Sequence, residues 1–110
     1  MEENKDFRRV KILNLLGISQ KAGYLVSGND SVIAEMRKGK LKIVFVASDS
    51  SEKTIDSFKK KCYFYQVLVN FDFTEEELSS SIGRNRKIIG LNNDKIYSSI
   101  EKLLEVNEWK

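Results

Sequence analysis

The 110-residue chain contains no histidine and a single cysteine, Cys62. Histidine is the commonest general base and metal ligand in proteins, so its absence removes the usual centre of hydrolytic and zinc chemistry. One cysteine without histidine forms neither an internal disulfide nor a Ser-His-Asp or Cys-His catalytic arrangement. The glycine-rich signatures GxxxxGK[ST] and GxGxxG are also missing. The sequence therefore predicts a protein that is not an enzyme and carries no cofactor or metal.

Long apolar runs are missing as well. No run approaches the roughly 18 residues that a membrane-spanning helix requires. The first residues, MEENKDFRRVK, are charged and lack the apolar core of a signal peptide. With 41% hydrophobic and 32% charged residues, the composition is that of a globular chain. We therefore expect one domain over residues 1–110, no membrane association, and a cytoplasmic location.

Positive charge is concentrated in the first third of the chain. The whole sequence has a net charge of +3, from 19 basic and 16 acidic residues. Residues 7–42 alone hold eight basic residues against two acidic ones, Asp30 and Glu35, an excess of six positive charges. Such an excess suits a polyanionic partner such as nucleic acid, and an ordinary solvated surface accounts for it equally well. Charge alone leaves both interpretations open.

Helical and strand patterns alternate along the chain. The spacing of apolar residues predicts helices over 7–22 and 29–38, and a third helix after residue 51. A capping box at Thr74 opens a fourth helix, and Asn93 is expected to cap the last. Continuous β-prone runs predict strands at 43–47, 65–69 and 87–91, and a brief strand at 24–26 stays open. This order predicts an α/β fold, a three-layer α/β/α sandwich with helices on both faces of the sheet.

Several residues are assigned to packing or to ordinary surface. The apolar stripe of the first helix is expected to be buried, and it consists of Phe7, Val10, Ile12, Leu13, Leu15 and Leu16. Cys62 falls on the apolar face of the third helix, which predicts a buried thiol. Aromatic residues beside a strand usually belong to the core, so we expect the same of residues 63–65, although such rings can also stack on bases. Lys59–Lys61 are expected on the exposed end of the third helix, and Gly90 is expected to serve packing.

The segment Ser27–Ser31 precedes the second predicted helix and is the first candidate site. The first turn of a helix leaves backbone N–H groups unpaired at its positive end, so phosphate oxygens or base carbonyls can bind there. Gly28 lets another backbone approach closely. Asn29 or Asp30 can pair with a base edge. Because Ser, Asn and Asp are also ordinary capping residues, a plain helix cap is the alternative interpretation.

Two basic turns are further candidates. The turn Arg37–Lys42 has four cations among six residues, and phosphate contacts made there would be sensitive to salt. The turn Gly83–Lys87 offers arginines, which suit bidentate phosphate contacts and stacking on bases. A solvated turn is the alternative in both cases. Helix-end cations that complement the dipole account well for Arg37 and Lys38.

Asp49 follows a buried strand, at the edge where open α/β sheets place their sites. Phospho-accepting receiver domains also carry an aspartate there, together with an acidic pair after the first strand that holds a cation. That pair is missing, because the nearest preceding acids are Asp30 and Glu35. We therefore expect Asp49 to be a loop residue or a helix cap.

The order of motifs resembles the ribosomal protein family of L-seven-Ae and L-thirty-e, particularly its small bacterial YlxQ-type members. The resemblance covers about residues 7–105, and its strength lies in the ordered set rather than in any single motif. The matching stretches are Leu15–Gly17, Gln20–Gly23, Val26–Gly28, Arg37–Val44, Ala47–Ser51, Lys61–Val67, Glu77–Leu78 and Ile82–Arg84.

This resemblance implies an α/β/α sandwich with a mixed central sheet and the binding of RNA, often at a kink-turn, a sharply bent helix–internal loop–helix. Carried over by position, the contacts come from the start of the second helix and the loop before the last strand, with two lysines beside the RNA backbone: Gly28, Asn29, Asp30, Ser31, Gly83, Arg84, Asn85, Lys21 and Lys38. The chain departs from the family pattern at one place. Kink-turn binders carry a polar pair and then a lysine, whereas this chain has Asp30, Ser31 and then Ala34, or Ile33 if the match is shifted by one residue.

The resulting hypothesis is a non-enzymatic RNA-binding protein for structured RNA, either kink-turn-like or ribosomal, with ribosome-associated proteins as further partners. The alternative is a protein–protein adaptor on the same fold with little RNA affinity. Ionic strength discriminates between them. RNA binding weakens steeply with salt, whereas a contact through an apolar patch does not.

Overall fold

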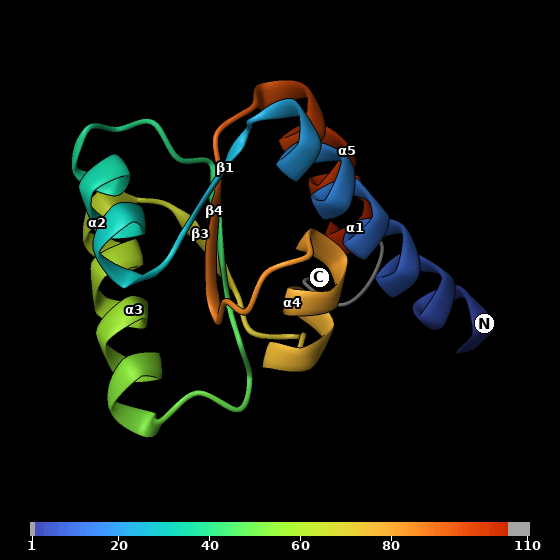
Figure 1. Cartoon of the computed structure of the whole chain (residues 1–110), viewed down its shortest axis with the longest axis horizontal. Helices are drawn as coiled ribbons and strands as arrows, with labels where there is room; N and C mark the ends of the chain where they lie inside the picture. The colour runs from blue at the N-terminus through green and yellow to red at the C-terminus, as the bar shows by residue number, and fades with distance from the viewer. Residues whose placement is uncertain (1, 106–110) are drawn as a thin grey trace.

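The computed structural model describes residues 2–105, and Figure 1 shows the arrangement of their helices and strands. Nine elements follow one another along the chain. They are α1 (Glu2–Ala22), β1 (Leu25–Ser27), α2 (Asn29–Arg37), β2 (Ile43–Val46), α3 (Glu52–Tyr65), β3 (Leu68–Asn70), α4 (Glu75–Ile82), β4 (Ile88–Leu91) and α5 (Asp94–Glu105). The brief strand that the sequence left open at 24–26 is present as β1. Within residues 2–105 no helix combines the length and the apolar character needed to cross a bilayer.

The four strands form one mixed sheet in the order β1-β4-β2-β3. β4 pairs antiparallel with both β1 and β2, whereas β2 and β3 are parallel. β1, β2 and β3 therefore run in one direction, and α2 and α3 return in the other. As a result the N-termini of α2 and α3 lie at the sheet end where β4 begins, and their C-termini lie at the opposite end (Figure 1). The mixed sheet that the resemblance implied is confirmed.

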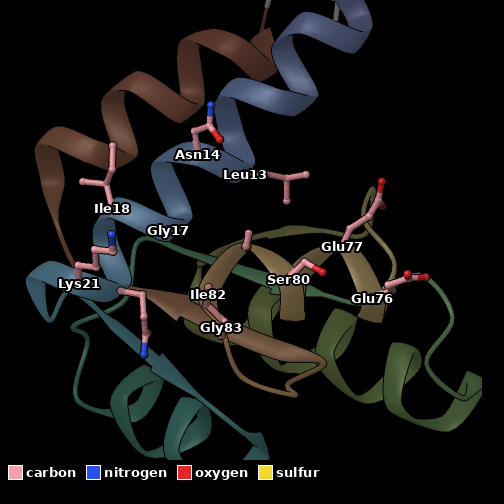
Figure 2. Close-up of a pocket in the computed structure, with 12 residues that line it drawn as sticks. Leu13, Asn14, Gly17, Ile18, Lys21, Glu76, Glu77, Ser80, Ile82 and Gly83 are labelled. Carbon is pink, nitrogen blue, oxygen red and sulfur yellow. The ribbon is translucent and has the colours of Figure 1, made fainter.

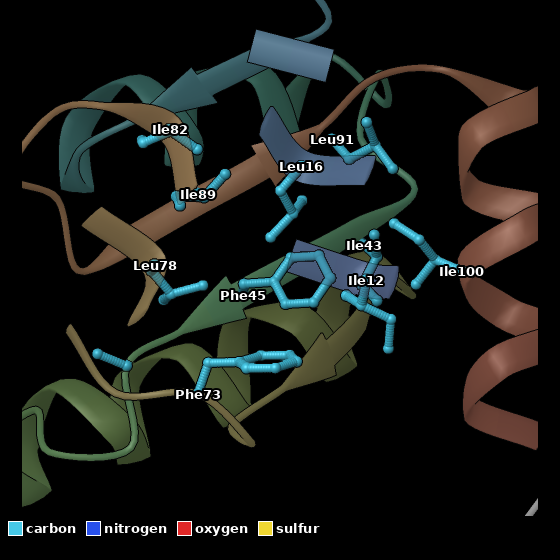
Figure 3. Packing of buried hydrophobic residues seen from close by; sticks show 11 residues of the cluster. Ile12, Leu16, Ile43, Phe45, Phe73, Leu78, Ile82, Ile89, Leu91 and Ile100 are labelled. Atoms are coloured by element: carbon cyan, nitrogen blue, oxygen red, sulfur yellow. The ribbon is translucent and has the colours of Figure 1, made fainter. Parts of the chain in front are cut away.

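Two hydrophobic layers enclose the sheet. Along β2 the side chains alternate, as a strand requires. Ile43 and Phe45 face the layer of α1, α4 and α5, and Val44 and Val46 face the layer of α2 and α3. Figure 3 shows the first layer, in which Phe45 lies beside Phe73, their ring centroids 6.1 Å apart. The three-layer α/β/α sandwich predicted from the sequence is confirmed.

Two glycines permit close packing. A Cβ on Gly90 would lie 2.6 Å from Leu41 Cδ1, so the α2 side of β4 has no room for a side chain at this position. A Cβ on Gly17 would lie 2.8 Å from the backbone oxygen of Ser81, which shows how closely α1 and α4 cross. The packing role predicted for Gly90 is confirmed.

The helices α3, α4 and α5 each begin with a side chain that caps the first turn. Ser51 Oγ accepts a hydrogen bond from the Thr54 amide at the start of α3. Thr74 and Glu77 form the predicted capping box of α4, and Asn93 Oδ1 accepts from the Ile96 amide of α5 at 2.9 Å. Asp49, expected to be a loop residue or a cap, accepts a hydrogen bond from the Glu75 amide and so serves α4.

The end of α3 differs from the prediction. Residues 65–69 were expected to form a strand, but α3 continues to Tyr65 and β3 begins only at Leu68. Gln66 ends the helix with a left-handed backbone conformation, at a φ of 59°. The sequence analysis had placed Tyr63 and Phe64 in the core. Because the helix continues through them, both rings lie at the surface instead, 87% and 75% exposed. The prediction for these two rings was wrong, whereas Cys62 on the opposite face is buried as expected, and burial raises the pKa of its thiol to about 11.

The buried stripe of α1 is narrower than predicted. α1 begins at Glu2 rather than near residue 7. Ile12 and Leu16 are fully buried against the sheet, but Phe7 and Val10 are 60% and 54% exposed. The helix contacts the sheet along one line of side chains, so apolar residues that lie off this line remain at the surface.

Candidate nucleic-acid interface

Gly28 forms a sharp corner between β1 and α2. Its backbone has φ 95° and ψ 152°, a region that is open essentially to glycine alone. Its amide donates to the carbonyl of Ile88 at 2.9 Å, and its own carbonyl accepts from the Val32 amide at 3.0 Å. This corner therefore places the first turn of α2 directly beside the start of β4.

The first turn of α2 lacks the side-chain cap that α3, α4 and α5 have. Gly28 occupies the N-cap position, and no side chain hydrogen-bonds to the turn. The amides of Asn29, Asp30 and Ser31 find no acceptor within residues 2–105, and all three residues are exposed. The plain-cap interpretation from the sequence therefore does not describe this helix. Its positive end is open to an external acceptor.

The loop between α4 and β4 is held against this corner. Gly83 ends α4 with φ 77°. Arg86 exchanges two hydrogen bonds with the Ser79 hydroxyl, which accepts from the Arg86 amide at 2.9 Å and donates to its carbonyl at 3.1 Å. Arg86 Nε also donates to Ser27 Oγ at 3.0 Å. Two elements that are far apart in the sequence are thereby fixed side by side, and Arg84 and Asn85 of the loop are exposed.

A hollow of about 550 Å³ separates this loop from α3. The start of α2 contributes Gly28 and Asn29, and the loop contributes Asn85. Three cations and one carboxylate are among its remaining lining residues, namely Lys53, Arg86, Lys87 and Glu75. The basic balance of the hollow comes from residues that the sequence did not select. Arg86 and Lys87 belonged to a candidate turn without being chosen, and Lys53 carried no signal at all, because only the parallel packing of α2 and α3 brings it here.

Lys21 lies on the other side of the α4–β4 loop. It lines a groove of about 910 Å³ between α1 and α4, together with Gly83. Figure 2 shows this groove, with α1 along one wall and α4 along the other. The loop thus separates two hollows, one at the start of α2 and one at the end of α1.

Glu77 lines the same groove and is engaged within the protein. Its carboxylate accepts from the Thr74 amide at 2.9 Å and forms an ion pair with Arg9 at 2.8 Å. The hydrogen bond from the Thr74 backbone and the nearby guanidinium together lower the pKa of this carboxyl group, against an opposing effect of burial. The guanidinium of Arg9 also lies over the Phe73 ring, 4.7 Å from its centroid. Glu77 is therefore a structural charge that joins α1 to α4.

Lys38 is separated from the other predicted site residues. It follows the last residue of α2, and this helix of nine residues is about 13 Å long at about 1.5 Å per residue. Its ammonium lies 3.5 Å from Glu35. Ala34 leaves an exposed apolar position one turn after Asp30. The structure thus brings Gly28, Asn29 and Asn85 to one hollow, with Asp30 and Ser31 exposed next in α2 and Arg84 exposed in the loop. Gly83 and Lys21 line the groove on the other side of the loop, and Lys38 lies at the far end of the helix.

Comparison with known proteins assigns the chain to a family. The profile of the Ribosomal protein L7Ae/L30e/S12e/Gadd45 family matches residues 10–100, and the chain belongs to this family. Among curated relatives, the RNA-binding protein YlxQ of Enterococcus faecium is 38% identical over 97 residues, which cover 88% of this chain and 94% of that protein. The RNA-binding protein YlxQ of Bacillus subtilis (strain 168) is 33% identical over 75 residues, which cover 68% and 75%.

Solved structures show the same architecture. A protein with unknown function from Bacillus halodurans C superimposes with a TM-score of 0.82 at 27% identity, covering 86% of this chain and 97% of that one. A 15.5 kD RNA-binding protein of Giardia lamblia superimposes with a TM-score of 0.70 at 16% identity, covering 87% and 89%. At that identity the second match speaks for the fold alone.

Proposed function

We propose that this chain is a non-enzymatic RNA-binding protein that holds structured RNA, of kink-turn or ribosomal type, at the corner formed by α2 and the α4–β4 loop. One observation carries the proposal. The first turn of α2 has no side-chain cap, and its exposed amides lie beside a loop rich in arginine and lysine. Membership of the L7Ae family and the naming of two relatives as RNA-binding proteins support it. The cytoplasm and the ribosome are the places where such a protein would meet its RNA.

The corner offers complementary contacts to a bent RNA. The open amides of α2 suit phosphate oxygens or base carbonyls. The Asp30 carboxylate accepts hydrogen bonds from the N–H groups of a guanine edge. Arg84 and Asn85 approach from the opposite side, and Arg84 brings a planar cation for phosphate or for stacking. Lys21 then neutralises the backbone of the strand that leaves through the α1–α4 groove.

The cation that Ala34 does not provide is supplied from other elements. Lys53 of α3 and Lys87 of the loop line the hollow beside Gly28, so they are the cations available to a phosphate or nucleotide at the start of α2. We expect both to contribute to affinity, with little effect on which RNA shape is preferred, because phosphate contacts carry no sequence information.

The test compares a kink-turn RNA with a straight duplex of the same composition by gel shift at several salt concentrations. We expect preference for the kink-turn, and a salt slope that falls by about one for each contacting cation removed. Lys21→Ala, Lys53→Ala and Arg84→Ala should weaken binding, and Lys102→Ala on the exposed side of α5 is the charge-matched control. Equal weak binding to both RNAs, unchanged in the three variants, would defeat the proposal.

One observation favours the alternative, a protein–protein adaptor. Phe7, Val10 and Ile18 are exposed apolar side chains on α1, and an amphipathic partner could cover them. Binding through this surface would persist at high salt. It would be lost in Ile18→Ser and retained in Arg84→Ala, the reverse of what RNA binding predicts.

A further inference from the structure

Tyr63 and Phe64 are the most exposed large apolar side chains within the described residues, at 87% and 75%. They lie next to each other in the last turn of α3. Phe64 is braced by an edge-on contact with the Tyr65 ring, whose centroid is 4.9 Å away. We call the pair of Tyr63 and Phe64 the aromatic platform. Two largely exposed rings at one helix end are costly in water and mark a surface that a partner can cover.

The aromatic platform lies at the opposite end of the sandwich from the corner of Gly28. The C-termini of α2 and α3 meet there, beside the turn that leads into β2 (Figure 1). A hollow of about 570 Å³ adjoins the platform, and Lys42, Gln66, Leu68 and Tyr97 contribute to its wall. α3 has 14 residues, so its two ends are about 20 Å apart. The platform is therefore a separate surface from the proposed kink-turn site.

Cations surround the aromatic platform. Lys60 is exposed and precedes Phe64 by one helical turn, which places the two on the same face. Lys59 precedes Tyr63 by one turn, but its ammonium lies over the Phe71 ring, 5.9 Å from the centroid. From the turn after α2, Lys40 is exposed at this end of the molecule and forms no ion pair within residues 2–105. Lys42 is paired with Asp94 at 3.1 Å. Asp56 is the acid on α3 one turn before Lys60, so the balance of charge around the rings remains positive.

We propose that the aromatic platform is a second RNA contact that stacks the unpaired bases of a single strand, with Lys40 and Lys60 holding its backbone. Exposed rings alone suit many partners, but rings among exposed lysines match a flexible polyanion with flat bases. Every base has a stacking face, so we expect this contact to tolerate many sequences. The Gln66 side chain is exposed beside the rings and offers a donor and an acceptor to a base edge.

The first experiment measures the fluorescence anisotropy of a labelled twelve-nucleotide oligouridine with the full chain at low salt. The double variant Tyr63→Ala, Phe64→Ala should weaken binding at least about fivefold, the lower bound for loss of one stacked base. Phe7→Ala removes another exposed aromatic, 60% exposed on α1, and should leave binding unchanged. Because Tyr63 and Phe64 are exposed, the double variant should remain folded, and circular dichroism checks this.

The second experiment reports contact directly. In a Trp109→Phe background, Phe64→Trp places one tryptophan on the platform, and stacking on a base should quench its fluorescence as oligouridine is added. Absence of quenching with bound oligouridine would overturn the proposal. So would equal losses in the Phe7→Ala control, or platform variants that leave oligouridine binding intact while abolishing capture of a protein partner.

A third comparison separates this inference from the proposed function. A kink-turn RNA without single-stranded tails should bind the platform variant as well as it binds the unmodified chain, and Lys21→Ala and Arg84→Ala should weaken only the kink-turn. If the chain binds oligouridine through the platform but shows no preference for the kink-turn, the proposed function falls and the platform stands. If it binds the kink-turn and not oligouridine, the platform falls.

Discussion

The Nε atom of Arg86 donates a hydrogen bond to the hydroxyl oxygen of Ser27 at 3.0 Å, across 59 residues of sequence. Ser27 is the last residue of β1 and immediately precedes the corner at Gly28. The same arginine is fixed to Ser79 through its own backbone. The Arg86 side chain therefore links the α4–β4 loop to the first turn of α2, the two halves of the proposed RNA site, in addition to the hydrogen bond from the Gly28 amide to the Ile88 carbonyl.

Ser27→Ala tests this link without removing any cation. Loss of a hydrogen bond to a charged donor should lower the free energy of unfolding by about 1.5–3 kcal/mol. Affinity for a kink-turn RNA should fall as well, because the loop is no longer fixed. Urea unfolding and gel shifts measure the two effects. Ser98→Ala on the exposed side of α5 is the matched control. If both variants are equally stable, the hydrogen bond between Arg86 and Ser27 does not stabilise the fold.

Gly28→Ala tests the backbone of the corner. A Cβ at this position would have nothing within 4 Å, so any effect comes from the backbone conformation at φ 95°. We expect a loss of about 1–3 kcal/mol in stability, the cost of an L-residue in such a region. Thermal unfolding measures it. A variant as stable as the unmodified chain would show that the corner does not need glycine.

Gly17→Ala tests the crossing of α1 and α4. Alanine favours a helix by about 1 kcal/mol over glycine, but here the new methyl group would lie 2.8 Å from the backbone oxygen of Ser81. Because a backbone atom cannot move aside as a flexible side chain can, we expect a net loss of about 1–3 kcal/mol. Urea unfolding measures whether the substitution lowers or raises the free energy of unfolding. A gain in stability would mean that helix propensity outweighs the contact.

Glu77 predicts a dependence of stability on pH. Its pKa is lower in the folded state, because the charged carboxylate accepts from Thr74 and pairs with Arg9. The contribution is therefore complete above the unfolded pKa of about 4.3 and is lost as the pH falls through the folded pKa. Glu77→Gln keeps an acceptor for the capping box and removes the charge. It should cost about 0.2–1 kcal/mol at pH 7, the range of exposed ion pairs.

The difference in stability between Glu77→Gln and the unmodified chain should narrow as the pH falls below about 4. Glu76→Gln, on the exposed side of the same helical turn, is the control and should show no such trend. Unfolding curves between neutral and acid pH measure it. A difference that widens in acid would mean that the folded state raises the pKa of Glu77 instead of lowering it.

The sequence was most informative where local chemistry decides structure. The Thr74 capping box, the cap at Asn93 and the buried strand near residues 43–47 all rest on neighbouring residues, and the structure confirms each of them. The end of α3 was missed because Tyr63 to Val69 suits either a helix or a strand. Only the parallel pairing of β3 with β2, which starts at Leu68, decides where the helix ends.

The same distinction between local pattern and long-range packing applies to the candidate site. The open turn at Asn29–Ser31 was visible as a pattern, and so was the loop at Gly83–Asn85. Lys53 was not visible, because its place beside Gly28 depends on how α2 packs against α3. The distance of Lys38 from the corner was equally hidden, since a positive charge near a helix in the sequence does not say at which end of the sandwich it lies.

The pairing of β1 with β4 determines when the corner at Gly28 can form during synthesis of the chain. Leu25 faces Leu91 in this ladder, and Gly28 is fixed through the carbonyl of Ile88. During synthesis, the first turn of α2 is therefore made before β4 and remains without this neighbour until β4 has emerged. A nascent chain that still lacks β4 cannot display the completed corner, so recognition of a folded RNA there has to wait for β4.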